Sequence, residues 1–117
     1  MQVEESREGG ILVVVPEEPR LDAYRAGPFK TALTGLVDAG HHQLVLDLAG
    51  VEFMDSTGLS AVVSILKRLG FYGVLVICGA RGAVADLFRL TRMDRVIQLV
   101  PTREEALAVA RSEAMSH

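Results

Sequence analysis

The chain has 117 residues, half of them hydrophobic, and a formal net charge of −3 at pH 7, which fits one soluble domain with a substantial core. This acidic balance excludes a typical nucleic-acid binder, because no basic run is available to neutralise phosphates. The single cysteine, Cys78, excludes an internal disulfide. A polar, acidic start and the lack of an apolar run of roughly 20 residues predict a cytoplasmic protein without a signal peptide or membrane span.

The first half of the chain predicts a hairpin, a helix and a buried strand. A Gly-Gly pair separates a short edge strand from a β-branched run, which indicates an antiparallel hairpin. Two prolines then end the second strand, and apolar residues at helical spacing follow. In chain order the predicted elements are a strand over 2–6, a strand over 11–15, a helix from about 28 to 40 and a strand over 43–48.

The second half alternates helices with strands. Leu59, Val62 and Leu66 fall on one face of an amphipathic helix. Thr102 and Glu105 have the spacing of a capping box at the start of the last helix. The predicted elements are a helix to about 69, a strand over 74–78, a helix ending near 92, a strand over 96–100 and a last helix from 102, with a tail that frays from about 112.

This order predicts an α/β fold. Strands that alternate with single helices form a mostly parallel sheet with right-handed crossovers. We therefore expect one domain over residues 1–117, with a sheet of about five strands, an N-terminal antiparallel hairpin and four helices.

The stretch Phe-Met-Asp-Ser-Thr-Gly-Leu, residues 53–59, places polar groups where a strand gives way to a helix. One interpretation is structural: Asp55 or Ser56 caps the helix by accepting hydrogen bonds from its first free N–H groups. A second interpretation is a catalytic serine. A nucleophile elbow needs glycines two residues on either side of the serine, but Met54 occupies one of these positions.

The sequence offers no base, metal site or phosphate loop to support catalysis at Ser56. His41 and His42 precede a strand, at its opposite end, and His117 lies in the tail. No Cys/His cluster provides metal ligands, and neither the Walker nor the dinucleotide glycine pattern occurs. We therefore expect no enzymatic activity and no cofactor.

A further interpretation makes Ser56 the substrate of a kinase. A hydroxyl at an exposed helix start is reachable, and a phosphate there adds about −1.5 to −2 charges. The positive end of the helix tolerates this charge, whereas an acidic or apolar partner surface docked over it does not. Phosphorylation would then remove a partner without unfolding the domain.

The stretch from Leu44 to Leu69, with its Asp-Ser-Thr-Gly-Leu core, resembles the signature of STAS domains, specifically of bacterial anti-sigma factor antagonists. The segments 20–23 and 74–107 resemble the rest of the family pattern. The resemblance implies partner switching. In this cycle the unmodified protein binds an anti-sigma factor, which is also a GHKL-type serine kinase, and a sigma factor is thereby released. Phosphorylation of Ser56 by the kinase ends the binding. A PP2C-type phosphatase then removes the phosphate and restores the binding.

The same resemblance implies which residues contact the partner. They are Asp22, Asp55, Ser56, Thr57, Gly58, Leu59 and Ser60, with Thr57 as a secondary candidate acceptor. Two residues depart from the family pattern: Arg20 stands where Glu is common, and Ser60 replaces a frequent glycine. The main alternative is a STAS interaction module without phosphorylation, such as a transport-complex subunit or a signalling scaffold.

Overall fold

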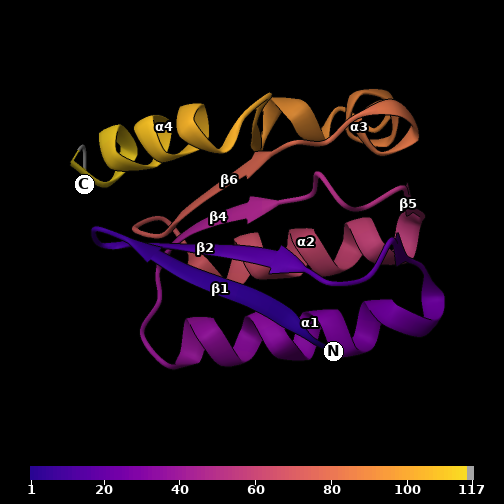
Figure 1. Cartoon of the computed structure of the whole chain (residues 1–117), viewed down its shortest axis with the longest axis horizontal. Coiled ribbons are helices and arrows are strands. Elements are labelled where there is room, and N and C mark those ends of the chain that lie inside the picture. Colours follow the sequence, from indigo (N-terminus) through magenta and orange to yellow (C-terminus); the bar gives the residue numbers. More distant parts are fainter. Residues whose placement is uncertain (116–117) are drawn as a thin grey trace.

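A computed structural model describes residues 1–115. It contains a five-stranded sheet in the order β1-β2-β4-β6-β7, a separate two-stranded sheet β3-β5, four α-helices and one 3₁₀ turn (Figure 1). The strands are β1 Val3–Glu8, β2 Ile11–Pro16, β3 Arg20–Leu21, β4 Gln43–Asp47, β5 Phe53–Met54, β6 Val74–Cys78 and β7 Gln98–Val100. The helices are α1 Ala23–Asp38, α2 Ser56–Leu69, α3 Gly82–Leu90, η1 Met93–Arg95 and α4 Arg103–Met115.

The strands of the five-stranded sheet run in the predicted directions: one antiparallel hairpin, and the rest parallel. β1 pairs antiparallel with β2 around the Gly9–Gly10 turn, and β2, β4, β6 and β7 are parallel to one another. The predicted α/β class, the hairpin and the four helices are therefore confirmed.

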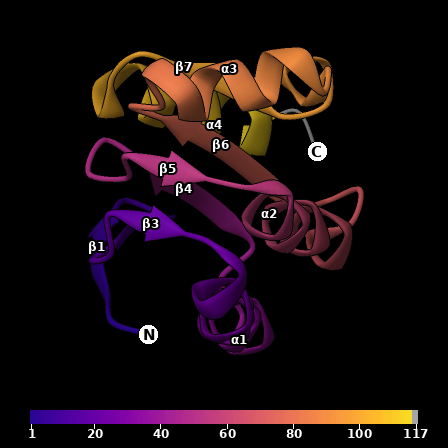
Figure 2. The same cartoon turned by 90° about the vertical axis from the view of Figure 1, so that its right-hand side faces the viewer.

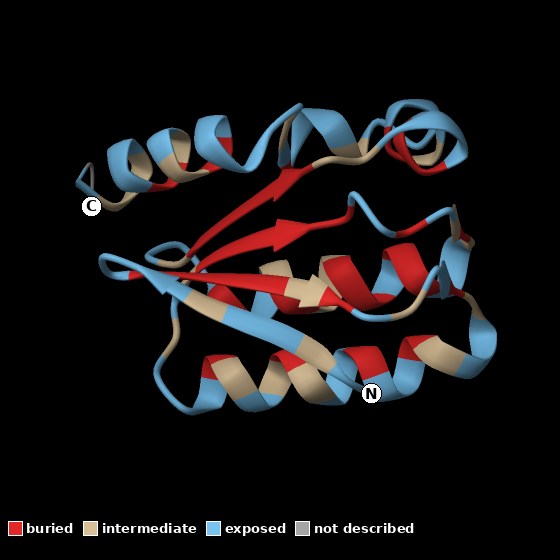
Figure 3. Cartoon of the chain, in the orientation of Figure 1, coloured by how far each residue is buried: buried red, intermediate tan, exposed pale blue. Residues whose placement is uncertain are grey.

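The core lies on both faces of this sheet, because β6 buries every side chain and β2 and β4 each bury all but one (Figure 3). One face packs against α1, α2 and α3 through large side chains such as Phe29, Ile65 and Phe88. The other face packs against α4 through small residues, including Ala106 and Ala110. Alanines let the backbone of α4 lie close to the strands.

Several predicted boundaries differ from the structure. The first helix begins at Ala23 rather than near residue 28, because Asp22 caps it, and Pro28 lies inside the helix. Residues 96–97 are not part of β7, because Val96 has helical dihedral angles and closes the 3₁₀ turn η1. The tail that was predicted to fray from about residue 112 continues α4 as far as residue 115, and Glu113 accepts a hydrogen bond from Gln98. The short strands β3 and β5 were not predicted at all.

The two short strands lie at one end of the molecule, beside the starts of α1 and α2. Figure 2 views the chain from this end and shows α1 and α2 nearly end-on, with β3 and β5 in front. No helix within the described part of the chain is both long and apolar enough to cross a membrane.

Candidate functional site

The pairing of β3 with β5 brings two helix starts together. The strands are parallel, with Arg20 opposite Phe53 and Leu21 opposite Met54. The next residue in each strand, Asp22 or Asp55, is the N-cap of the helix that follows. Two acidic caps that are 33 positions apart in the sequence therefore lie side by side at one edge of the fold.

Asp55 caps α2 as one of the sequence interpretations predicted. Its Oδ1 accepts hydrogen bonds from the backbone N–H groups of Thr57 and Gly58 at 3.0 and 3.1 Å. The Thr57 hydroxyl donates to the same oxygen. The hydrogen bond from the Thr57 hydroxyl, followed by that from the Gly58 amide, lowers the pKa of Asp55 below its usual range. The amide of Ala23, at the start of α1, contributes in the same direction.

Ser56 is the first residue of α2, and it is exposed. Among the described residues its side chain has no hydrogen-bond or ionic partner, whereas the neighbouring Thr57 hydroxyl is held by Asp55. Of the two adjacent hydroxyls, that of Ser56 is therefore the one free to react or to be contacted.

Gly58 and Leu59 lie beneath this surface. A Cβ atom on Gly58 would lie 2.3 Å from the carbonyl oxygen of Leu21, so only glycine allows α2 to pack so closely against the end of β3. Leu59 is only 7% exposed and belongs to the core. Because both are buried, these two predicted contact residues shape the site from below, and Ser60, which is exposed, lies at the surface.

A groove of about 290 Å³ runs along α2 from this point. Its floor includes Leu59, and its wall on the other side comes from the end of α3 and from η1. The residues that line it are Leu59, Ser60, Val63, Ser64, Lys67, Thr91 and Met93. The sequence analysis did not predict this groove, because it depends on how α3 and η1 pack beside α2.

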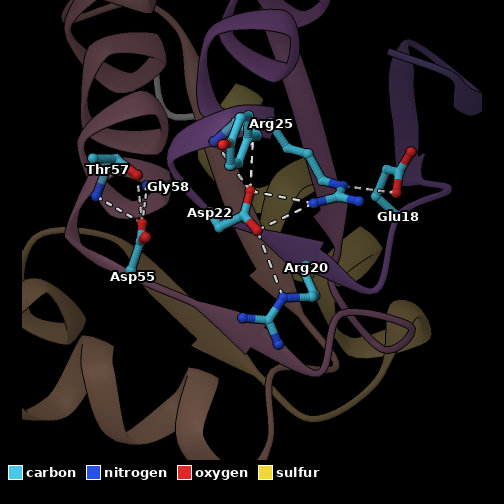
Figure 4. A network of polar contacts seen from close by, with 8 residues as sticks. Glu18, Arg20, Asp22, Arg25, Asp55, Thr57 and Gly58 are labelled. Atoms are coloured by element: carbon cyan, nitrogen blue, oxygen red, sulfur yellow. Dashed lines mark hydrogen bonds and ion pairs between the residues drawn. The ribbon is translucent and has the colours of Figure 1, made fainter.

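Asp22 is the centre of a network of charged residues (Figure 4). Its Oδ1 accepts from the amides of Tyr24 and Arg25 at 3.1 and 3.2 Å, and its Oδ2 lies 3.1 Å from Nη1 of Arg25. Arg25 also donates from Nε to Glu18 at 3.0 Å. Desolvation raises the pKa of Asp22, but the charge and hydrogen bonds of Arg25 outweigh it, so the pKa lies below its usual range.

Arg20 extends this network toward β5. Its Nε lies 3.6 Å from Oδ2 of Asp22, and its guanidinium carbon lies 4.2 Å from the centre of the Phe53 ring. The side chain is half exposed. Arg25 and Phe53 are site residues that were not predicted. The contact of Phe53 with Arg20 depends on the β3-β5 pairing, whereas Arg25 contacts Glu18 and Asp22, which are near it in the sequence.

The remaining reactive side chains lie elsewhere. Cys78 is buried on the α4 side of the sheet, where desolvation raises the pKa of its thiol to about 11. His41 and His42 precede β4, at the end of the strand away from Ser56, and His117 lies outside the described residues. Within residues 1–115, no three His, Cys, Asp or Glu side chains are placed to hold a metal ion.

This geometry can be compared with known proteins. The sequence profile of the STAS domain matches residues 2–106, which is most of the chain. The chain belongs to the STAS domain family. The resemblance noted in the stretch from Leu44 to Leu69 is thereby confirmed.

The most similar STAS proteins include several named as anti-sigma factor antagonists. The anti-sigma-B factor antagonist of Staphylococcus epidermidis is 31% identical over 80 residues, or 68% of this chain and 74% of that protein. The crystal structure of an anti-sigma factor antagonist from Mycobacterium paratuberculosis is 28% identical, with a TM-score of 0.86 over 94% of this chain and 93% of that one.

Two structures of the anti-sigma factor antagonist SpoIIAA share the fold. The unphosphorylated form has a TM-score of 0.69 over 95% of this chain and 97% of its own. The phosphorylated form, described as a Bacillus cell fate determinant, has a TM-score of 0.68 over 92% and 97%. Each is 15% identical to this chain, so the likeness concerns the fold alone.

Proposed function

We propose that this STAS domain is an anti-sigma factor antagonist that works by partner switching. The unphosphorylated chain binds an anti-sigma factor of the GHKL serine kinase type and so frees a sigma factor. Phosphorylation of Ser56 ends the binding, and a PP2C-type phosphatase restores it. The observation that carries the proposal is the exposed Ser56 hydroxyl at the start of α2, among the residues Asp22, Asp55, Thr57, Gly58, Leu59 and Ser60 expected at the partner surface.

The local structure supports Ser56 rather than Thr57 as the acceptor. The Thr57 hydroxyl is already bound to the Asp55 carboxylate, and a kinase would have to break that bond. A phosphate on Ser56 would lie at the positive end of α2, where the helix dipole tolerates it. It would also lie beside Asp55, so the negative charge facing a partner would increase.

Intact-mass spectrometry after incubation with ATP and each purified GHKL kinase of the source organism tests the modification. We expect one kinase to add a single phosphate to the wild-type chain and none to Ser56→Ala. The matched control Thr57→Val should still gain one phosphate. A chain that stays unmodified with every kinase would favour the alternative, an interaction module without phosphorylation.

Calorimetric titration of the same kinase tests the switch itself. Ser56→Asp should weaken binding, because it adds one negative charge at the docked surface. A penalty of about 3 kcal/mol for the phosphate would correspond to roughly 150-fold weaker binding. Because Asp carries a single charge, Ser56→Asp should weaken binding by less than the phosphate does. Equal affinities for Ser56→Asp and the wild-type chain would contradict the proposal.

A further inference from the structure

Arg20 is positioned at the edge of the site by two contacts, while its terminal nitrogens stay unused within the described part of the chain. One face of the guanidinium lies on the Phe53 ring, and its Nε faces Asp22. These two contacts restrict a side chain that is otherwise flexible, so less entropy is lost when it binds a further group. Figure 4 shows the two terminal nitrogens of Arg20 directed away from Asp22.

The terminal nitrogens of Arg20 have no acceptor among the described residues. The nearby carboxylates are engaged by other donors. Asp22 is bound by Arg25 at 3.1 Å and Glu18 by Arg25 at 3.0 Å, while Asp55 is bound by the first amides of α2. A guanidinium with two free parallel N–H donors is suited to bidentate binding of a carboxylate.

Arg20 also lies where a partner bound over Ser56 would reach it. It is paired in register with Phe53, three residues before Ser56. Tyr24, in the first turn of α1, is 89% exposed. Arginine and tyrosine are the residue types that most often dominate binding energy at protein interfaces.

We propose that Arg20 selects the partner by binding a carboxylate on the surface of its kinase. This inference rests on the proposed function and adds the chemistry of the partner: the kinase bears an Asp or Glu opposite Arg20. A kinase with a basic residue at that position would be rejected, because two like charges would meet at the interface.

Binding of the GHKL kinase that phosphorylates the wild-type chain tests this proposal. All variants carry Ser56→Ala, so that no phosphate forms during the titration. Compared with that background, Arg20→Gln should bind about tenfold more weakly and Arg20→Glu more weakly still. Arg20→Lys should recover only part of the affinity, since a lysine cannot bind a carboxylate through two parallel donors.

The control is Arg111→Glu, an equal charge reversal on the exposed side of α4, across the sheet from α1 and α2. It should leave the affinity unchanged. A charge-reversal scan of the kinase then identifies the carboxylate: one Asp→Arg or Glu→Arg kinase variant should bind Arg20→Glu more tightly than the unaltered kinase does.

The outcomes separate this inference from the proposed function. Suppose that the wild-type chain is phosphorylated on Ser56 but that Arg20→Glu in the Ser56→Ala background binds the kinase as tightly as Ser56→Ala alone. The inference on Arg20 is then overturned, while the proposed phosphorylation switch is unaffected. If Arg20→Gln binds as tightly as the Ser56→Ala background but, in a chain that keeps Ser56, changes how the phosphorylated form releases its kinase, Arg20 binds the phosphate instead, which also overturns the inference. If no kinase binds or modifies the wild-type chain, both fail.

Discussion

Gly58 shows how a single residue sets the geometry of the switch. Its missing side chain lets the first turn of α2 contact the Leu21 carbonyl, where a Cβ would be 2.3 Å from that oxygen and 2.9 Å from Cγ of Met54. Backbone atoms cannot move aside as a flexible side chain can. The distance between the Asp22 and Asp55 loops therefore depends on glycine at this position.

Gly58→Ala should lower the free energy of unfolding by about 1–3 kcal/mol, because the extra methyl group must push β3 away from α2. The matched control is Gly35→Ala in α1, where a Cβ would meet nothing within 4 Å. That change should instead stabilise the chain by up to about 1 kcal/mol, the helix preference of alanine over glycine. Urea unfolding of both variants measures the difference, and equal effects of the two would contradict the close packing at Gly58.

Asp55 should also make the stability depend on pH. Its pKa in the folded chain lies below the ordinary value of 3.8, because the Thr57 hydroxyl and the Gly58 amide hold the charged form. The stabilisation is therefore complete above the pKa of the unfolded chain and is lost as the pH falls through the folded value. Asp55→Asn keeps a capping oxygen but cannot titrate.

The free energies of unfolding of the wild-type chain and Asp55→Asn should therefore differ at neutral pH and converge as the pH falls below about 4. Urea titrations at a series of pH values measure this difference. A difference that stays constant into the acid range would show that the charge on Asp55 does not contribute.

At the scale of elements, the two capped helices act as one unit. α1 and α2 meet at their starts through β3 and β5, and at their ends Arg68 binds both oxygens of Asp38 at 2.8 Å. An exposed pair of this kind contributes only about 0–1 kcal/mol. The main cohesion between the helices therefore comes from their shared apolar face, which includes Phe29, Leu33 and Ile65.

The sequence predicted the larger elements because each carries a local pattern. Short apolar runs mark β4 and β6, helical spacing marks α2, and Asp55 is a preferred capping residue. The same reasoning placed Ser56 at a helix start beside Asp55. These features depend on neighbours in the chain, so they can be read without a structure.

The rest of the site depends on contacts between distant segments. β3 and β5 have two residues each, too few for any periodic pattern. The stacking of Arg20 on Phe53 and the groove beside α2 follow from that pairing and from the position of η1. Of the expected contact residues, Leu59 was placed on the correct helix and on its apolar face, and it is buried as that pattern predicts.

At the scale of the whole molecule, the sheet separates the switch from α4. Ser56 lies on the side of α1 and α2, whereas Cys78 is covered by α4 on the other face. Asp47, only 9% exposed, holds the start of α4 through an ion pair with Arg103 at 2.9 Å. Because Cys78 is only 1% exposed and packs against α4, a thiol reagent can label it only when α4 opens, and the raised pKa of the thiol, about 11, slows the reaction further at neutral pH.

Arg103→Ala should accelerate that labelling, because it leaves the Asp47 carboxylate without its cationic partner and weakens the attachment of α4. A loss of about 1–2 kcal/mol corresponds to a rate increase of roughly 5- to 30-fold. Ser56→Asp should leave the rate at its wild-type value, since the added charge changes the partner surface and not the packing across the sheet. Faster labelling of Ser56→Asp would mean that negative charge at Ser56 loosens the whole fold, and partner release would then be a consequence of unfolding rather than of surface charge.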